Sequence, residues 1–199
     1  MKNRNYRLIV MLDEFEKVDI RQDLFQDWSD DWRAKVSAGL FALVIASKRP
    51  IYEYYYHKSS LTSPLSNIFS TTVIGAMEHD AWLKLLQEGF SIENNTLNLI
   101  KELAGRLPFY TQMAAALVWQ HSEPERIKAK FSSKVTPHWE ELWQELTDAE
   151  RRALKVAAGI SALDISAPKT QDLLQRFGLI ESDGRLFSNT FAEFVRGLR

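Results

Sequence analysis

Two adjacent carboxylates, Asp13 and Glu14, directly follow a run of five apolar residues at positions 8–12. A continuous apolar run bounded by charge predicts a strand that is buried on both faces, as in a parallel sheet between helices. Carboxylates at the carboxyl end of such a strand lie at the edge where open α/β sheets bind their ligands. The same pattern also arises where a buried strand simply returns to water, so the rest of the chain must decide between a site and a strand end.

Two carboxylates at this position can take part in nucleotide chemistry if a phosphate-binding loop lies beside them. In P-loop nucleotidases an Asp at this position, known as Walker B, holds Mg²⁺ directly or through water, and a following Glu orients or activates the attacking water. The phosphate-binding pattern G-x-x-x-x-G-K-[ST], known as Walker A, requires Gly followed by Lys. None of the eight glycines in the sequence has a Lys after it. The sequence therefore looks like part of a nucleotide-binding protein that lacks the phosphate-binding loop.

The overall composition argues against several classes of function. Lys plus Arg number 25 and Asp plus Glu number 26, so the whole molecule has no basic field that would attract nucleic acid or an anionic membrane. There is no cysteine, which excludes disulfides, thiolate metal sites and a cysteine nucleophile. The apolar run near the N-terminus has only five residues, too few for a signal peptide or a membrane span. We therefore expect a soluble, cytoplasmic protein that does not contact a membrane.

The first part of the chain is predicted to form an α/β unit. Residues 6–12 and 40–46 have the pattern of buried strands, and residues 23–39 are predicted to form a helix that covers one face of the sheet. A strand, a helix and a second strand favour parallel pairing with a right-handed crossover. Asp13 and Ser47 would then lie at the same edge of the sheet.

An irregular segment follows the second strand, which ends at Pro50 because proline cannot donate to a central ladder. Residues 51–72 show no clear period, and a loop of this length in a compact domain is usually functional or flexible. Its tyrosines could stack on bases, but such residues more often cover a hydrophobic surface. Residues 73–74 are predicted to form a short third strand.

The rest of the sequence is predicted to be helical. The expected helices are residues 78–86, residues 92–103, a helix over 109–121 that Pro108 opens, a helix capped near 146–150 that runs to Ala158, residues 169–177, and a final helix from Thr190. Pro124 and Pro137 are expected to interrupt a connecting region. Residues 179–187 have the pattern of a hairpin with Asp183 and Gly184 at its turn. The order helix, helix, hairpin, helix over residues 146–199 is the outline of a winged helix.

In this order, the pieces resemble the carboxyl-terminal two thirds of a bacterial STAND-type, AAA-related P-loop ATPase module. The matching segments are RLIVMLDEFEKV, LFALVIASKRPIYEY, SPLSNIFSTTVIGAMEHDAWLKLL, AGRLPFYTQMAAALVW and the terminal winged helix. The resemblance implies a partial P-loop NTPase core with parallel strands over residues 1–76, an all-α lid over 77–145 and a winged helix over 146–199. It also implies ATP and Mg²⁺ as cofactors, with weak or absent binding expected for this chain alone.

The resemblance assigns a role to five residues. Asp13 matches the position associated with Mg²⁺, and Glu14 matches the catalytic carboxylate. Ser47 and Arg49 match the end of the sensor strand, where a polar or cationic side chain faces the γ-phosphate. Pro108 matches the lid proline that packs near the adenine. Two of these positions also have simpler interpretations, since Arg49 could be a solvated strand end and Pro108 could only begin a helix.

Three functional hypotheses follow from the sequence. The first is a truncated STAND-like regulatory or signalling ATPase module that is inactive by itself and associates with a partner or with itself, because its apolar strands are poorly covered. The second is DNA binding through the winged helix. Its contact residues would be Lys169, Gln171, Arg176 and Arg185, interrupted by the acids Asp172, Glu181 and Asp183. The third is a protein-interaction scaffold.

Overall fold

The computed structural model describes residues 7–17, 22–51, 65–88, 93–160 and 168–198 of the chain. The tyrosines of residues 52–56 lie outside the described residues. The chain divides into two compact units, Met1–Thr72 and Val73–Arg199. The division into three parts expected from the sequence stays a prediction.

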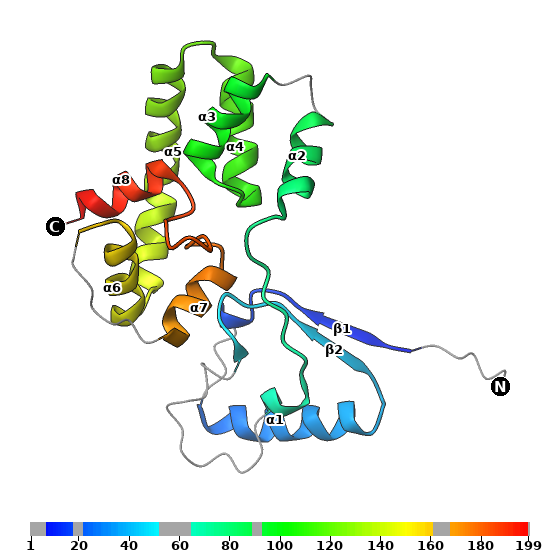
Figure 1. The fold of residues 1–199 in the computed structure, drawn as a ribbon. Coiled ribbons are helices and arrows are strands. Elements are labelled where there is room, and N and C mark those ends of the chain that lie inside the picture. Colours follow the sequence, from blue (N-terminus) through cyan, green and yellow to red (C-terminus); the bar gives the residue numbers. More distant parts are fainter. Residues whose placement is uncertain (1–6, 18–21, 52–64, 89–92, 161–167, 199) are drawn as a thin grey trace. The chain divides into compact units, whose positions relative to one another are not determined.

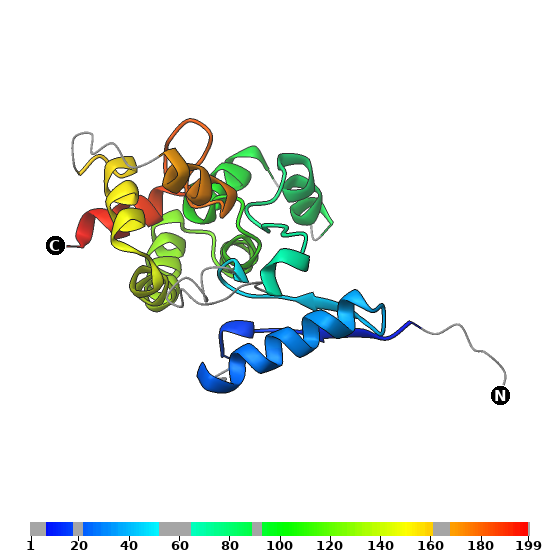
Figure 2. The ribbon, with the colours of Figure 1, turned by 90° about the horizontal axis from the view of Figure 1, so that it is seen from below.

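The first unit contains two parallel strands and one long helix (Figure 1). β1 (Ile9–Leu12) pairs with β2 (Ala42–Ile45), with Ile9 opposite Ala42 and Leu12 opposite Ile45. The helix α1 (Gln22–Ser37) connects them and runs along the sheet, as Figure 2 shows from below. Two short 3₁₀ turns, η1 (Phe15–Lys17) and η3 (Leu65–Ile68), complete the described part of this unit. The parallel strand pair expected from the sequence is confirmed.

Aromatic rings join α1 to the strand ends. The ring of Phe15 lies 6.0 Å from that of Trp28, whose ring lies 4.9 Å from that of Trp32. Trp32 in turn meets the edge of Phe41 at 5.2 Å, directly before β2. Aromatic pairs at these distances add to the burial of the face that α1 covers.

The prediction that both strand faces are buried is wrong. Ile9 is 59% exposed, Met11 is 74% exposed and Val44 is 47% exposed, and the residues between them are only partly buried. Side chains alternate between faces along a strand, so these three residues share one open face of the sheet. The physical reason is that α1 covers one face only, and the described part of this unit has no second layer.

Residues 73–74 do not form the expected third strand. They show no strand pairing, and Ile74 is 91% exposed. These residues instead begin the second unit, where the next residue, Gly75, packs against other backbone. An apolar pair with no partner strand beside it cannot form a ladder.

The regular structure described in the second unit is helical, apart from one antiparallel bridge between Ile180 and Leu186, and loops connect the helices. Its helices are α2 (His79–Gln87), α3 (Asn94–Ala104), α4 (Pro108–Gln120), α5 (Pro124–Glu145), α6 (Asp148–Ala157), α7 (Pro168–Arg176) and α8 (Asn189–Gly197). Local signals set their ends. Pro108 starts α4, a reciprocal capping box between Thr147 and Glu150 starts α6, and the Ser188 side chain accepts from the Phe191 amide to start α8.

The expectation that Pro137 interrupts a connecting region is wrong, because α5 runs unbroken through it for 22 residues. A proline inside a helix costs about 3 kcal/mol or more, since it removes a hydrogen bond and clashes with the preceding turn. Phe131, Val135 and Trp139 lie four residues apart on one face of α5, and each is at most 1% exposed. Burial of this apolar stripe outweighs the cost of the proline.

Trp139 is the centre of the second unit's core. Its ring lies 5.2 Å from Phe191, 5.6 Å from Phe194 and 6.5 Å from Phe187, and Phe131 and Tyr110 also meet it edge on. Every member of the buried hydrophobic cluster comes from this unit. Among the described helices, none has both the length and the apolar character that a membrane crossing requires.

Candidate functional site

The predicted site residues of the first unit gather at the carboxyl edge of the sheet. Asp13 and Glu14 follow β1, and Ser47 and Arg49 follow β2, which is parallel to it. The Phe15 amide donates to the Ala46 carbonyl at 3.1 Å and ties the two strand ends together. This edge is where ligands bind in open α/β sheets.

Glu14 has an unusual backbone conformation. Its φ is +51°, the only positive φ at a non-glycine residue in the described part of the chain. The Glu14 amide donates to Asp13 Oδ1 at 2.9 Å, and the Glu14 carboxylate accepts from Lys17 Nζ at 2.7 Å. This hydrogen bond with the carboxylate raises the pKa of Lys17 above its usual value. Strained backbone in a side-chain-bearing residue is a feature of functional sites.

Ser47 and Arg49 form a tight turn at the end of β2. The Ser47 hydroxyl donates to the Arg49 carbonyl at 2.6 Å, and both residues are partly buried. The neighbouring Lys48 amide donates to Glu16 Oε2 at 3.3 Å, which again links the two strand ends. The strand register thus places Ser47 and Arg49 at the same edge of the sheet as Asp13 and Glu14.

The described residues do not form a complete magnesium site. Mg²⁺ requires near-octahedral oxygen ligands, and in the part of the chain that the structure describes no group of three or more His, Asp or Glu could hold a metal ion. Asp13 Oδ1 accepts from the Glu14 amide, and the Glu14 carboxylate is bound to Lys17. Asp13 by itself could offer Mg²⁺ one carboxylate, so further oxygen ligands would have to come from outside the described residues.

Pro108 belongs to the second unit. It is exposed and occupies the first turn of α4, where its missing N–H costs nothing. A cavity of about 460 Å³ with a mostly apolar lining lies between α2 and α4. Leu85, Thr111 and Trp119 help to line it, whereas Pro108 does not. No sequence motif marks this cavity, so it was not predicted.

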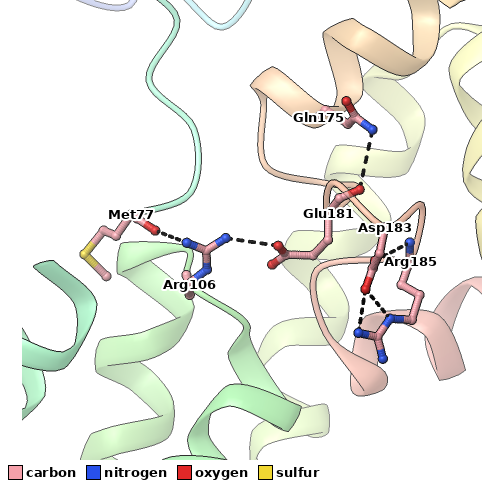
Figure 3. Close-up of polar contacts among 6 residues, drawn as sticks. All are labelled: Met77, Arg106, Gln175, Glu181, Asp183 and Arg185. Carbon is pink, nitrogen blue, oxygen red and sulfur yellow. Dashed lines mark hydrogen bonds and ion pairs between the residues drawn. The ribbon is translucent and has the colours of Figure 1, made fainter. Parts of the chain in front are cut away.

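Arg106 is a second feature that the sequence analysis missed. One guanidinium nitrogen, Nη1, donates to the Met77 carbonyl at 2.9 Å, and the other, Nη2, donates to Glu181 Oε2 at 3.0 Å (Figure 3). The Met77 amide donates back to the Arg106 carbonyl at 2.9 Å. A polar cavity of about 440 Å³ adjoins this residue. The available signal was a cation placed between the helix-ending Gly105 and the helix-starting Pro108.

The residues predicted for DNA contact lie on α7 and the loop after it. Lys169, Gln171 and Arg176 are exposed on α7. Arg185 donates from Nε to Asp183 Oδ2 at 2.7 Å, and this hydrogen bond holds the pKa of Asp183 below its usual value. One of the three predicted cations is therefore already paired with an acid.

Comparison with known proteins gives a fold relationship. The chain matches no family model, and it matches no curated protein. A solved structure, that of the Walker-type ATPase PABY2304 of Pyrococcus abyssi, is similar at a TM-score of 0.58 and 13% sequence identity. The match covers 96% of this chain and 63% of that chain. The chain thus has a fold like that of a Walker-type ATPase and spans less than two thirds of its length.

Proposed function

We propose that this chain is the Walker B, sensor and lid portion of a STAND-type, ATP-dependent regulatory module, and that it does not hydrolyse ATP by itself. The observation that carries the proposal is the meeting of Asp13, Glu14, Ser47 and Arg49 at one edge of a parallel strand pair. The similarity in fold to a Walker-type ATPase supports it.

The proposed roles follow from charge and position. Asp13 is the magnesium ligand that this chain would supply, and Arg49 and Ser47 would face the γ-phosphate, where developing charge needs fixed cations and donors. Glu14 would orient the attacking water. Its present ion pair with Lys17 is well exposed, at 60% and 66% for the two side chains, so water can replace that contact at low cost.

The second unit supplies the proposed switch. Helices α2–α5 would act as the lid, with Pro108 near the adenine, and α6–α8 would act as a winged helix that closes on the nucleotide. A module of this kind has two states, and a ligand that binds one of them better shifts the balance. We also propose a protein partner, or a second copy, at the open sheet face in the cytoplasm.

The test begins with the DNA upstream of the Met1 codon and in adjacent reading frames, where a G-x-x-x-x-G-K-[ST] sequence is expected. Calorimetry of the chain alone with Mg-ATP should show affinity no tighter than about millimolar, because the phosphate-binding backbone is missing. The chain joined to the upstream segment should bind ATP at micromolar concentrations and hydrolyse it.

Matched variants make this test specific. Asp13→Asn and Glu14→Gln should abolish hydrolysis in the joined protein, whereas Asp31→Asn, which removes an exposed partner of Lys35 on α1, should not. Micromolar binding by the chain alone would show that it holds phosphate by another route. A joined protein that neither binds nor hydrolyses ATP would refute the nucleotide proposal.

DNA binding is a second candidate, and the exposure of Lys169, Gln171 and Arg176 along α7 favours it. So few cations neutralise few phosphates, so the affinity should be weak and should fall with salt by a slope of about −2 to −3. Fluorescence anisotropy with labelled duplex DNA, for the chain and for Lys169→Gln/Arg176→Gln, measures that slope. Binding unchanged by the double substitution would exclude α7 as the contact surface.

A further inference from the structure

Arg106 holds together two segments that are far apart in the sequence. We call residues 73–77 the connector, since they lead into the second unit, and we call residues 168–186 the α7 segment, which comprises α7 and the loop after it. The Arg106 guanidinium donates to the Met77 carbonyl of the connector and to the Glu181 carboxylate of the α7 segment. Figure 3 shows the guanidinium between the two acceptors.

The two segments also meet directly, without side chains between them. A Cβ atom on Gly75 would lie 2.2 Å from the Arg176 carbonyl oxygen, and one on Gly178 would lie 2.5 Å from the Ala76 backbone nitrogen. Gly178 also has a φ of +74°, which favours glycine. The connector therefore packs backbone to backbone against the end of α7.

Helix α7 itself packs on fewer helices than α8 does. Helix α7 packs mainly on α6, whereas α8 packs on α3, α5 and α6. Leu174 and Ile180 anchor the segment in the core, but its outer surface carries the exposed Lys169, Gln171 and Arg176. A displacement at its contact with the connector would move that surface without unpacking α8.

We propose that Arg106 couples the connector to the α7 segment, so that displacement of the connector is transmitted to the exposed surface of α7. A guanidinium suits this role because its planar fork donates to two acceptors at once in a fixed geometry. The Arg106 and Glu181 side chains are 22% and 29% exposed, so their ion pair is shielded from water without being locked in the core. The coupling requires no nucleotide and is independent of the function proposed above.

Amide hydrogen exchange of the whole chain, followed by NMR, tests the coupling. The Met77 amide reports on the connector through its bond to the Arg106 carbonyl, and the Glu181 amide reports on the α7 segment through its bond to the Arg185 carbonyl. Glu181→Ala removes the bond between Arg106 and the α7 segment and leaves the bond between Arg106 and the Met77 carbonyl in place. We expect both amides to exchange faster, on the order of tenfold, because a charge-assisted hydrogen bond is lost.

A matched control lies in the same loop. Asp183→Ala removes the exposed ion pair with Arg185, which does not reach the connector, and should leave the Met77 amide unchanged. Arg106→Lys keeps the charge but loses the fork, and should accelerate the Met77 and Glu181 amides together.

Three results would overturn the proposal. Faster exchange only at the amide of residue 181 after Glu181→Ala would show that the ion pair is a local contact. Unchanged exchange at both amides would show that the ion pair stabilises neither segment. Acceleration of the Met77 amide by Asp183→Ala would point to general loosening of the loop. The Ile127 amide in α5 serves as a control for general destabilisation. If Glu181→Ala also accelerates exchange at Ile127, the Arg106→Lys variant provides the test. The coupling is then supported only if Arg106→Lys accelerates exchange at the Met77 and Glu181 amides and leaves exchange at Ile127 unchanged.

Discussion

The two units of the chain differ in how they bury their apolar residues. In the second unit helices surround a cluster centred on Trp139, which is 1% exposed. In the first unit the sheet has one covered face and one open face, on which Ile9, Met11 and Val44 are exposed. The residues proposed for chemistry, Asp13 and Glu14, belong to the open unit.

This difference in burial indicates which unit needs further elements to complete it. The helical unit buries its own core, whereas parallel strands are normally covered on both faces. The edge that carries Asp13 and Ser47 is therefore expected to gain order when further elements cover the sheet.

Truncation of an apolar side chain should destabilise the second unit far more than the first. Trp139→Ala should lower the free energy of unfolding by about 3 to 5 kcal/mol, because it empties a fully buried site among aromatic rings. Met11→Ala should lower it by about 0.5 kcal/mol or less, because this side chain is already exposed. Urea unfolding followed by circular dichroism measures both. Equal losses would mean that the sheet face is as well buried as the helical core.

A side chain added where the backbone of the connector packs against the α7 segment should cause the next largest loss of stability. Gly178→Ala should cost about 2 kcal/mol more than Gly184→Ala, since both glycines have positive φ and share the strain of about 1 kcal/mol, but only Gly178 meets neighbouring backbone. A Cβ on Gly184 has nothing within 4 Å. Urea unfolding measures both variants. Equal losses in the free energy of unfolding would show that the backbone around Gly178 shifts without cost to accommodate the Cβ.

Association through the open sheet face should be of intermediate size. The chain should self-associate at tens of micromolar, and Met11→Thr/Val44→Thr should weaken this by about tenfold, because apolar area is removed from the contact. Ile74→Thr is the control, since Ile74 is exposed but lies in the second unit. Sedimentation velocity measures the association, and a chain that stays monomeric and binds no hydrophobic dye would have closed its own core.

Removal of the two site carboxylates should have little effect on stability. Asp13→Asn/Glu14→Gln should leave the melting temperature unchanged or raise it, since the adjacent acids repel one another and the Lys17 contact is exposed. Differential scanning calorimetry of the variant and the unmodified chain provides the comparison. A large fall would show that the carboxylates have a structural role.

The smallest effect concerns pH in the loop after α7. The Arg185 side chain holds the pKa of Asp183 below its usual value, so the stability that this pair contributes is present above the unfolded pKa and is lost as pH falls through the folded one. Carbon-detected NMR titration should show a low pKa for Asp183 that returns toward its ordinary range in Arg185→Gln. An unchanged value in that variant would assign the shift to backbone donors.

Local signals explain which parts of the fold were predictable. The parallel pair followed from two apolar runs with a helix between them. The starts of α4 and α6 followed from Pro108 and from the capping sequence at Thr147. Pro137 was not a helix end, because tertiary packing of α5 outweighs a local helix breaker. Burial on both strand faces was assigned from the apolar pattern alone, which cannot say whether a second layer is present.

The site was predictable only where its residues are near the strand ends in sequence. Asp13, Glu14 and Ser47 could be placed at one edge because parallel pairing fixes their register. Arg106 and Glu181 are 75 residues apart, and no periodic pattern connects them. Contacts of that kind depend on the packing of helices and become visible only in the folded chain.

The left-handed backbone of Glu14 has a consequence for anyone who wishes to stabilise this protein. A standard engineering choice at a φ of +51° is glycine, which removes the strain of about 1 kcal/mol. Glu14→Gly would also delete the carboxylate beside Asp13. A design that optimises stability alone would therefore select this substitution and remove the carboxylate proposed here for catalysis, so residue 14 should be held fixed in any such library.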